Sequence, residues 1–224
     1  ITSNLTATGT QLFVQQYGTG VLTLSGVISG ANAVVKSGPG ALVLSGTNTY
    51  TGGLVVNAGQ VRLGSAGMGA AANVVTLNGG SLVANPGTTA FTLAQLVGPT
   101  SAGTLFLRNT AATPAAATIT VGRNDNSTLF TGTLTASADN RLALTKIGSG
   151  TLTLRPSVAS TYTGTTTVQG GTLELDFANS GALTSLLGAS ALSLASGDFT
   201  LRGRAGLAAV QTLGNLTINQ SGGK

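Results

Sequence analysis

The segment KSGPGALVL at residues 36–44 recurs as KIGSGTLTL at residues 146–154, and the two share the pattern K-x-G-x-G-[AT]-L-[VT]-L. Each is followed by a second shared motif, NTYTG at 48–52 and STYTG at 160–164. Self-similarity over such a long unit is the signature of a repeat architecture, in which each unit packs on its neighbours.

The similarity extends beyond these motifs. LVVNAGQVRL at 54–63 matches TTVQGGTLEL at 166–175, and weaker matches continue upstream and downstream of both. We therefore expect residues 1–224 to form one continuous domain of about two long repeat units, with the sharpest repeat motifs at 36–64 and 146–175. The chain starts and stops out of phase with the unit, and it begins at Ile1 with no signal peptide. We interpret it as mature or excised from a longer protein.

Short runs that alternate apolar residues with Thr, Ser or other polar residues fill each unit, and most end at Gly, Asn or Ser. This alternation is typical of half-buried strands, and the residues that follow suit tight corners. The predicted strands are 21–24, 41–44, 54–56, 60–63, 74–77, 81–83, 104–107, 118–121, 128–130, 142–144, 151–154, 165–168, 172–175, 191–194, 199–201 and 216–218. Residues 111–118 are predicted as a loop because Pro114 interrupts their helical composition.

Two all-β architectures suit many short strands with glycine corners, an antiparallel sandwich or barrel and a parallel solenoid. The solenoid is favoured because the strands are short, the corners recur at matched places and aromatic residues make up only 4% of the chain. We predict a right-handed parallel β-helix, without terminal caps, of roughly ten rungs and about 45–50 Å in length.

Composition excludes several classes of function. The chain has no Cys and no His, so disulfides, thiolate chemistry and serine triads that need histidine are not expected. No apolar run reaches the roughly 18 residues of a spanning helix. The net charge is +5 and the pI is about 10.3, but the ten cations are scattered, so no nucleic-acid partner is predicted.

The segments 36–64 and 146–175 resemble the passenger-associated transport repeat of autotransporters. The second copy departs from the family pattern at residues 155–159 (RPSVA), which affects the loop before Tyr162 and leaves the strands unchanged. The resemblance implies a parallel β-helix at the surface of a Gram-negative-type bacterium, with a barrel in the outer membrane as part of the full-length protein.

Few side chains suggest chemistry. Glu174 and Asp176 share one strand face, as a hydrolytic pair or a cation site would require, but an exposed polar face is the favoured interpretation. The motif residues Lys36 and Lys146 are interpreted as corner charges, either solvated or capping strand-end carbonyls, in preference to glycan contacts. Tyr50 and Tyr162 are expected to pack beneath the turns, with stacking on sugars as the alternative.

Other motifs are set aside. Residues 30–37 (GANAVVKS) lack the glycine that a phosphate loop requires before its lysine, since Val35 stands there. Asn4, Asn126 and Asn215 fit glycosylation patterns that a Thr-rich chain contains by chance. We predict no catalytic, cofactor-binding or metal site and no cofactor.

The predicted function is that of a non-enzymatic extracellular structural or surface protein, a rigid passenger or stalk segment that self-associates or adheres. Its expected partners are neighbouring β-helical segments of the same or identical chains, surface glycans, and host or neighbour-cell surfaces. Two alternatives stay open. One is a subunit that stacks end to end into a filament or surface layer. The other is a carbohydrate-active β-helix enzyme.

Overall fold

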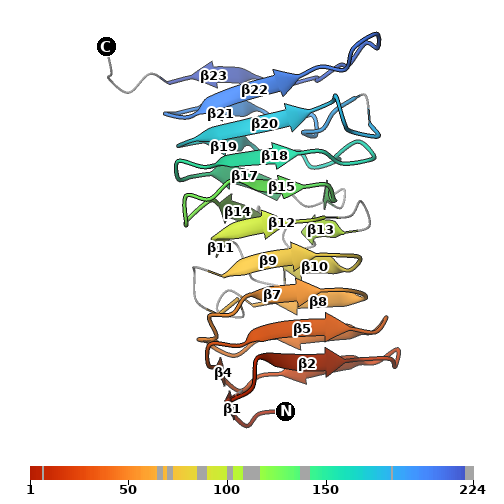
Figure 1. Cartoon of the computed structure of the whole chain (residues 1–224), viewed down its shortest axis with the longest axis vertical. Coiled ribbons are helices and arrows are strands. Elements are labelled where there is room, and N and C mark those ends of the chain that lie inside the picture. Colours follow the sequence, from red (N-terminus) through yellow and green to blue (C-terminus); the bar gives the residue numbers. More distant parts are fainter. Residues whose placement is uncertain are drawn as a thin grey trace.

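The computed structural model describes residues 1–6, 8–64, 68–69, 73–84, 90–99, 103–107, 117–136, 142–182 and 184–219. In this part of the chain every secondary-structure element is a β-strand, and every strand pair is parallel. The strands stack in chain order into a rod, with β1 and β2 at one end and β22 and β23 at the other (Figure 1). The predicted parallel β-solenoid is confirmed.

The strands form three faces. Face 1 contains β2 (Gln11–Gln15), β5 (Ala33–Ser37), β7 (Leu54–Val56), β9 (Val74–Leu77), β12 (Gln95–Val97), β15 (Thr128–Phe130), β18 (Thr151–Leu154), β20 (Thr172–Asp176) and β22 (Asp198–Arg202). Face 2 contains β3 (Val21–Leu24), β6 (Ala41–Leu44), β8 (Gln60–Leu63), β10 (Ser81–Ala84), β13 (Thr104–Leu107) and β16 (Thr133–Ala136). Face 3 contains β1 (Leu5–Thr6), β4 (Ile28–Ser29), β11 (Ala90–Leu93), β14 (Ala117–Val121), β17 (Leu142–Lys146), β19 (Thr166–Val168), β21 (Leu192–Leu194) and β23 (Leu216–Ile218).

Each face continues through backbone contacts where two successive strands do not pair directly. On face 1, a parallel bridge between Gly98 and Phe130 joins β12 to β15. On face 2, the amide of Thr161 donates to the carbonyl of Leu134, so the second Tyr-Thr-Gly segment continues the face beyond β16. On face 3, the amide of Thr49 donates to the carbonyl of Ile28, so the first Tyr-Thr-Gly segment follows β4.

Inward-facing aliphatic side chains of successive turns lie in register and form the core. On face 2, Leu42 pairs with Val61 and Val61 with Leu82, and all three are fully buried. The alternation predicts this, because every second residue of a strand points to the same side. Each such side chain contributes about 2 kcal/mol by leaving water.

The solenoid makes about eight turns, fewer than the roughly ten expected. The turns differ in length, which explains the difference. Leu42 pairs with Val61, 19 residues later, whereas Leu105 pairs with Leu134, 29 residues later. The longer turns add residues between their strands without adding rungs.

Most predicted strands are present within a residue or two of their expected bounds, but β1, β2, β4, β5, β11, β12 and β16 were not predicted. Strand β5 shows why. Val34, Val35 and Lys36 are consecutive and all buried, so the segment has no alternation to detect. The predicted loop at 111–118 lies outside the described residues as far as residue 116, and β14 begins at Ala117.

The two repeat copies occupy different faces. Lys36 lies in β5 on face 1, but its counterpart Lys146 ends β17 on face 3. The next strand of the motif, β6 in the first copy and β18 in the second, likewise moves from face 2 to face 1. The second copy is therefore rotated by one of the three faces relative to the first.

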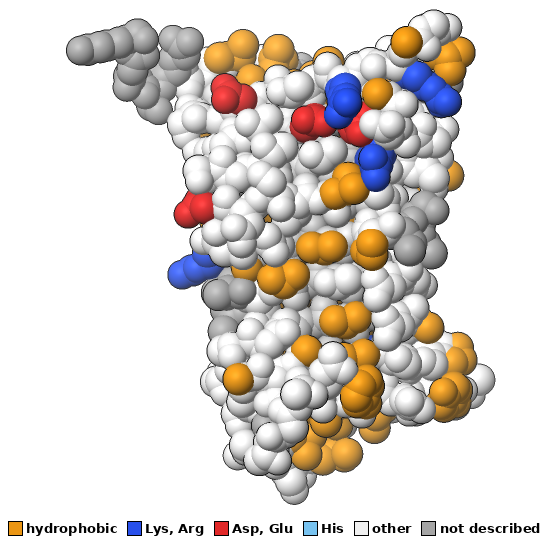
Figure 2. Space-filling model, viewed as in Figure 1, with side chains coloured by type: hydrophobic (Ala, Val, Ile, Leu, Met, Phe, Trp, Pro, Cys, Tyr) orange, Lys and Arg blue, Asp and Glu red, His pale blue; other side chains and the backbone are white. Residues whose placement is uncertain are grey.

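The outer surface of face 1 changes character along the rod. Phe13, Val55 and Val97 point outward on its first turns, whereas Thr153 and Glu174 occupy the equivalent column further on. Figure 2 shows acidic and basic side chains gathered over the turns that contain β18, β20 and β22. The same sheet geometry thus presents an apolar surface at one end and a charged one at the other.

Candidate functional site

Lys36 buries its ammonium group in the corner between β5 and β6. Its Nζ donates to the carbonyl oxygens of Ser37 at 2.8 Å and Gly38 at 2.7 Å within that corner. A third bond, of 3.3 Å, reaches the carbonyl of Ala58 on the next turn. The residue is fully buried.

Lys146 repeats this arrangement in the second copy. Its Nζ donates to the carbonyls of Ile147 at 2.6 Å, Gly148 at 2.9 Å and Gly170 at 3.2 Å, the last again on the following turn. The interpretation that the motif lysine caps strand-end carbonyls is confirmed, and the alternative of a solvated corner charge is wrong.

Burial lowers the pKa of both lysines below the ordinary value, since the charged form loses hydration. At Lys146 the carboxylate of Asp125 acts in the opposite direction and favours the charged form. With their ammonium groups enclosed by carbonyl oxygens, neither lysine is placed to contact a surface glycan.

Tyr50 and Tyr162 also point inward and are almost completely buried. The Tyr162 hydroxyl lies 2.8 Å from Thr166 Oγ1, which lies 3.2 Å from Ser190 Oγ. Among the residues that the structure describes, the Tyr50 hydroxyl has no partner, and Leu54 stands where the second copy has Thr166. Packing beneath the turns is confirmed for both rings, and sugar stacking on them is wrong.

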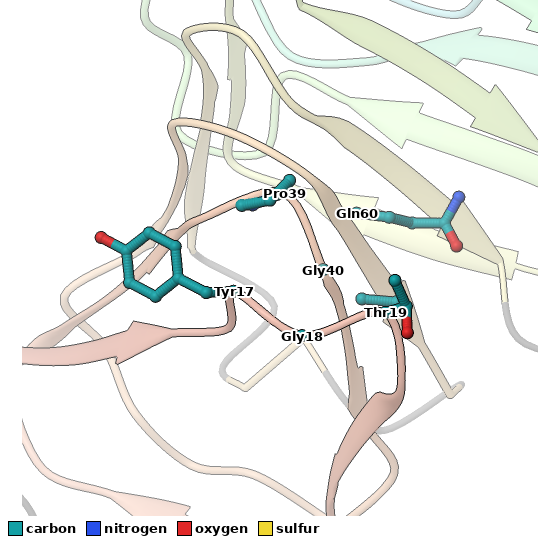
Figure 3. A pocket seen from close by; sticks show the side chains of 7 residues that line it. Tyr17, Gly18, Thr19, Pro39, Gly40 and Gln60 are labelled. Atoms are coloured by element: carbon teal, nitrogen blue, oxygen red, sulfur yellow. The ribbon is translucent and has the colours of Figure 1, made fainter.

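The third tyrosine, Tyr17, is on the surface. It follows β2 and lines a shallow pocket of about 370 Å³ between the corner after β2 and the corner of the next turn. The other lining residues are Gly18, Thr19, Pro39, Gly40, Ala41 and Gln60. Figure 3 shows the Tyr17 ring and the Gln60 side chain projecting away from each other, with the backbone of Gly18 and Gly40 between them.

The two corners approach each other closely because of glycine. A Cβ on Gly40 would lie 2.4 Å from the carbonyl oxygen of Gly18, so a larger residue would push the turns apart. The amide of Gly40 donates to the carbonyl of Gln16 at 2.8 Å, and the Gln16 side chain donates to the carbonyl of Gly20 at 2.9 Å. The floor of the pocket is therefore a hydrogen-bonded backbone.

The matching corner of the second copy is bridged by side chains. There Asp125 Oδ1 accepts from the amide of Ser149 at 2.7 Å, and Ser127 Oγ accepts from the amide of Thr151 at 3.0 Å. Pro39 replaces Ser149 in the first copy and has no amide hydrogen to donate. The equivalent bond cannot form, and the first corner keeps an open pocket.

Comparisons with known proteins agree with this geometry. The family model of the passenger-associated transport repeat matches residues 34–63 and 144–175, which contain the two lysine corners and the inward-facing tyrosines. The chain is a repeat-bearing passenger segment of the autotransporter type.

A curated relative extends the similarity of this passenger segment beyond the repeats. The adhesin BmaC autotransporter of Brucella suis biovar 1 (strain 1330) is 34% identical over 169 residues, which cover 75% of this chain and 5% of that protein. The passenger segment thus spans a small part of the relative's length. No solved structure matches it.

The paired carboxylates of the passenger segment do not form an acid–base pair. Glu174 is half-exposed in the middle of β20, whereas Asp176 is buried at its end. Asp176 lies 3.8 Å from the Arg155 guanidinium and accepts from the backbone amide of Asn179 at 3.2 Å and from its side chain at 2.9 Å. These contacts hold the corner that follows β20.

Among the residues the structure describes, no three acidic, histidine or cysteine side chains gather where they could hold a metal ion. The described chain also contains no helix able to span a membrane. Of the three candidate glycosylation residues, Asn4 uses its side-chain oxygen to accept from the amide of Val27 at 2.9 Å.

Sequence reasoning missed the Tyr17 pocket. A signal for it was available. Tyr50 and Tyr162 are each followed by Thr-Gly, and both point into the core, whereas Tyr17 is followed directly by Gly18 and precedes the lysine corner by one turn. A tyrosine outside the repeat motif is the one to examine for an exposed role.

Proposed function

We propose that this passenger segment is a non-enzymatic, extracellular part of a bacterial surface protein, a stiff rod that carries adhesive contacts on its outer corners. The observation that carries the proposal is the stack of buried aliphatic side chains that the described turns share. Such a stack makes each turn a platform of fixed orientation for the corner attached to it.

The name of the relative supports the adhesive part of the proposal, since that protein is an adhesin. The contacts of Asp176 support the non-enzymatic part of the proposal. Its carboxylate pairs with Arg155 and accepts from the amide of Asn179, so it is not available to act together with Glu174 of the same strand. The location is supported by the autotransporter type of the repeats.

The adhesive function is tested with beads coated with the purified 224-residue chain. We expect these beads to bind epithelial monolayers in larger numbers than beads coated with the heat-denatured chain. Equal numbers would overturn the proposal. Release of reducing ends from polysaccharides by the same preparation would favour the enzymatic alternative, and protease shaving of intact producing cells checks the surface location.

A second candidate, end-to-end stacking, is favoured by the apolar side chains exposed on the outermost described turns. On the last described turn Leu216 is 55% and Ile218 is 61% exposed, although they pair with Leu192 and Leu194 of the core, while on the first turn Phe13 is 62% exposed but points outward from face 1. A further turn of the same kind would cover Leu216 and Ile218, whether from the same polypeptide or from an identical chain. Sedimentation at rising concentration tests the second possibility, and a strictly monomeric chain would contradict it.

A further inference from the structure

We infer that the pocket at Tyr17 binds a neutral carbohydrate. The inference rests on the proposed adhesive function and names its ligand class. Four observations carry it: an exposed aromatic ring on one wall, amide and hydroxyl groups on the other, a close-packed backbone floor and the absence of formal charge among the seven lining residues.

The aromatic wall is held ready for a ligand. The Tyr17 side chain is 69% exposed, and its hydroxyl donates to Gln15 Oε1 at 3.3 Å. A sugar ring has an apolar face of C–H groups that stacks on an aromatic ring, and tyrosine adds a polar edge to that surface.

The opposite wall supplies hydrogen bonds. Arg62 Nε donates to the side-chain oxygen of Gln60, which leaves the Gln60 amide nitrogen as a donor towards a ligand hydroxyl. Thr19 is exposed beside it and both donates and accepts. Neutral sugars present a hydroxyl on most ring carbons, and such mixed groups match them.

Size and charge narrow the ligand further. A volume of about 370 Å³ is near the lower end of the range of small-molecule pockets, enough for one or two sugar rings. None of the seven lining residues is charged, and the cation beside them, the Arg62 guanidinium, already donates to the Gln60 side chain, so a neutral sugar suits this lining better than a sialylated or sulfated one. Binding of a neutral sugar would also resist added salt, since screening acts on charged pairs.

Calorimetric titration of the 224-residue chain with maltotriose, mannotriose, tri-N-acetylchitotriose and sialyllactose tests the inference at about 50 and 500 mM salt. We expect at least one neutral trisaccharide to bind equally at both salt concentrations. Tyr17→Ala should weaken that binding about tenfold or more, since one stacked ring contributes on this order. Tyr17→Phe should retain binding within about threefold.

Val158→Ala is the matched control, because Val158 is likewise exposed at a corner but lies on another turn, and it should bind as the unchanged chain does. Binding of sialyllactose alone, no binding of any neutral trisaccharide, or equal binding by Tyr17→Ala would overturn the inference.

The bead assay separates this inference from the proposed function. Beads that adhere while no neutral trisaccharide binds would overturn the carbohydrate site and leave adhesion standing. A trisaccharide that binds in a Tyr17-dependent way while the beads fail to adhere would support the site and contradict the adhesive function.

Discussion

The ammonium nitrogen of Lys36 donates to the carbonyl oxygen of Ala58 across the gap between two successive turns. Lys146 makes the same inter-turn bond to Gly170 on a different face of the rod. The motif lysine therefore links its own corner to the corner of the next turn by a hydrogen bond, whichever face of the rod the repeat copy occupies. Four predictions concern this corner and the residues that accompany it.

Lys36→Met and Lys146→Met should each destabilise the protein by about 2–4 kcal/mol, because three carbonyl oxygens lose their donor in a buried corner. Urea unfolding measures the loss, and amide exchange should quicken first in the two turns joined by the lysine. Arg204→Met is the control, since Arg204 is exposed. Similar midpoints for all three variants would show that the lysines do not tie the turns together.

The two buried tyrosines should respond differently to loss of the hydroxyl. Tyr162→Phe should cost about 1 kcal/mol, because the bond to Thr166 is lost. Tyr50→Phe should be neutral or slightly stabilising, because that hydroxyl is buried with no partner among the described residues. Thermal unfolding of the two variants side by side gives the comparison, and an equal loss in both would contradict the assigned contacts.

Stability should fall as the pH rises above about 10, the ordinary pKa of a phenol. Burial raises the pKa of Tyr50 and Tyr162 well above that value. The folded chain therefore keeps protons that the unfolded chain loses, and each phenol removes up to about 1.4 kcal/mol per pH unit above pH 10.

The buried lysines act in the opposite sense. Their pKa is lowered in the folded chain, so their contribution to stability rises as the pH approaches their ordinary value. Comparing the unchanged chain with a Tyr50→Phe/Tyr162→Phe variant cancels this effect. The difference between the two unfolding free energies should stay constant below pH 10 and change only above it, with the unchanged chain losing stability relative to the variant. A constant difference across that range would contradict the prediction.

The glycine of the Tyr-Thr-Gly motif should not tolerate a side chain. A Cβ on Gly164 would lie 2.1 Å from the carbonyl oxygen of Leu142 on the preceding turn, so Gly164→Ala should cost about 2–3 kcal/mol. Gly203 has no atom within 4 Å of the equivalent position, and Gly203→Ala should leave the unfolding midpoint almost unchanged. A small effect at Gly164 would indicate that the turns can separate at low cost.

Local pattern was sufficient for most of the strands and for the inward direction of residues such as Leu42 and Leu152. Local pattern did not predict burial where the buried residue is charged. Lys36 is fully buried, which composition alone would never suggest, because its partners are backbone carbonyls that leave no mark in the sequence. The sequence left two interpretations of the motif lysine open, a solvated corner charge and a cap on strand-end carbonyls, and the structure decided for the second.

The candidate site was harder to predict than the fold. Tyr17 and Gln60 are distant in the sequence and line one pocket only because the turns that carry them stack, with the Gly40 corner between them. In the second copy Asp125 and Ser127 bridge the corner by accepting from the amides of Ser149 and Thr151, whereas the first copy has Pro39, without an amide hydrogen, in place of Ser149.

The sequence by itself determined that the chain coils into parallel turns, because alternation and glycine corners are local properties that repeat. Only the tertiary structure decided that the second copy sits one face away from the first and that Tyr17 lines a pocket. The physical reason is that the face a strand occupies depends on the accumulated length of all the turns before it. Lengthening a corner costs little free energy, about 0.6 kcal/mol per doubling of a loop. No local residue therefore fixes the total length of the preceding turns.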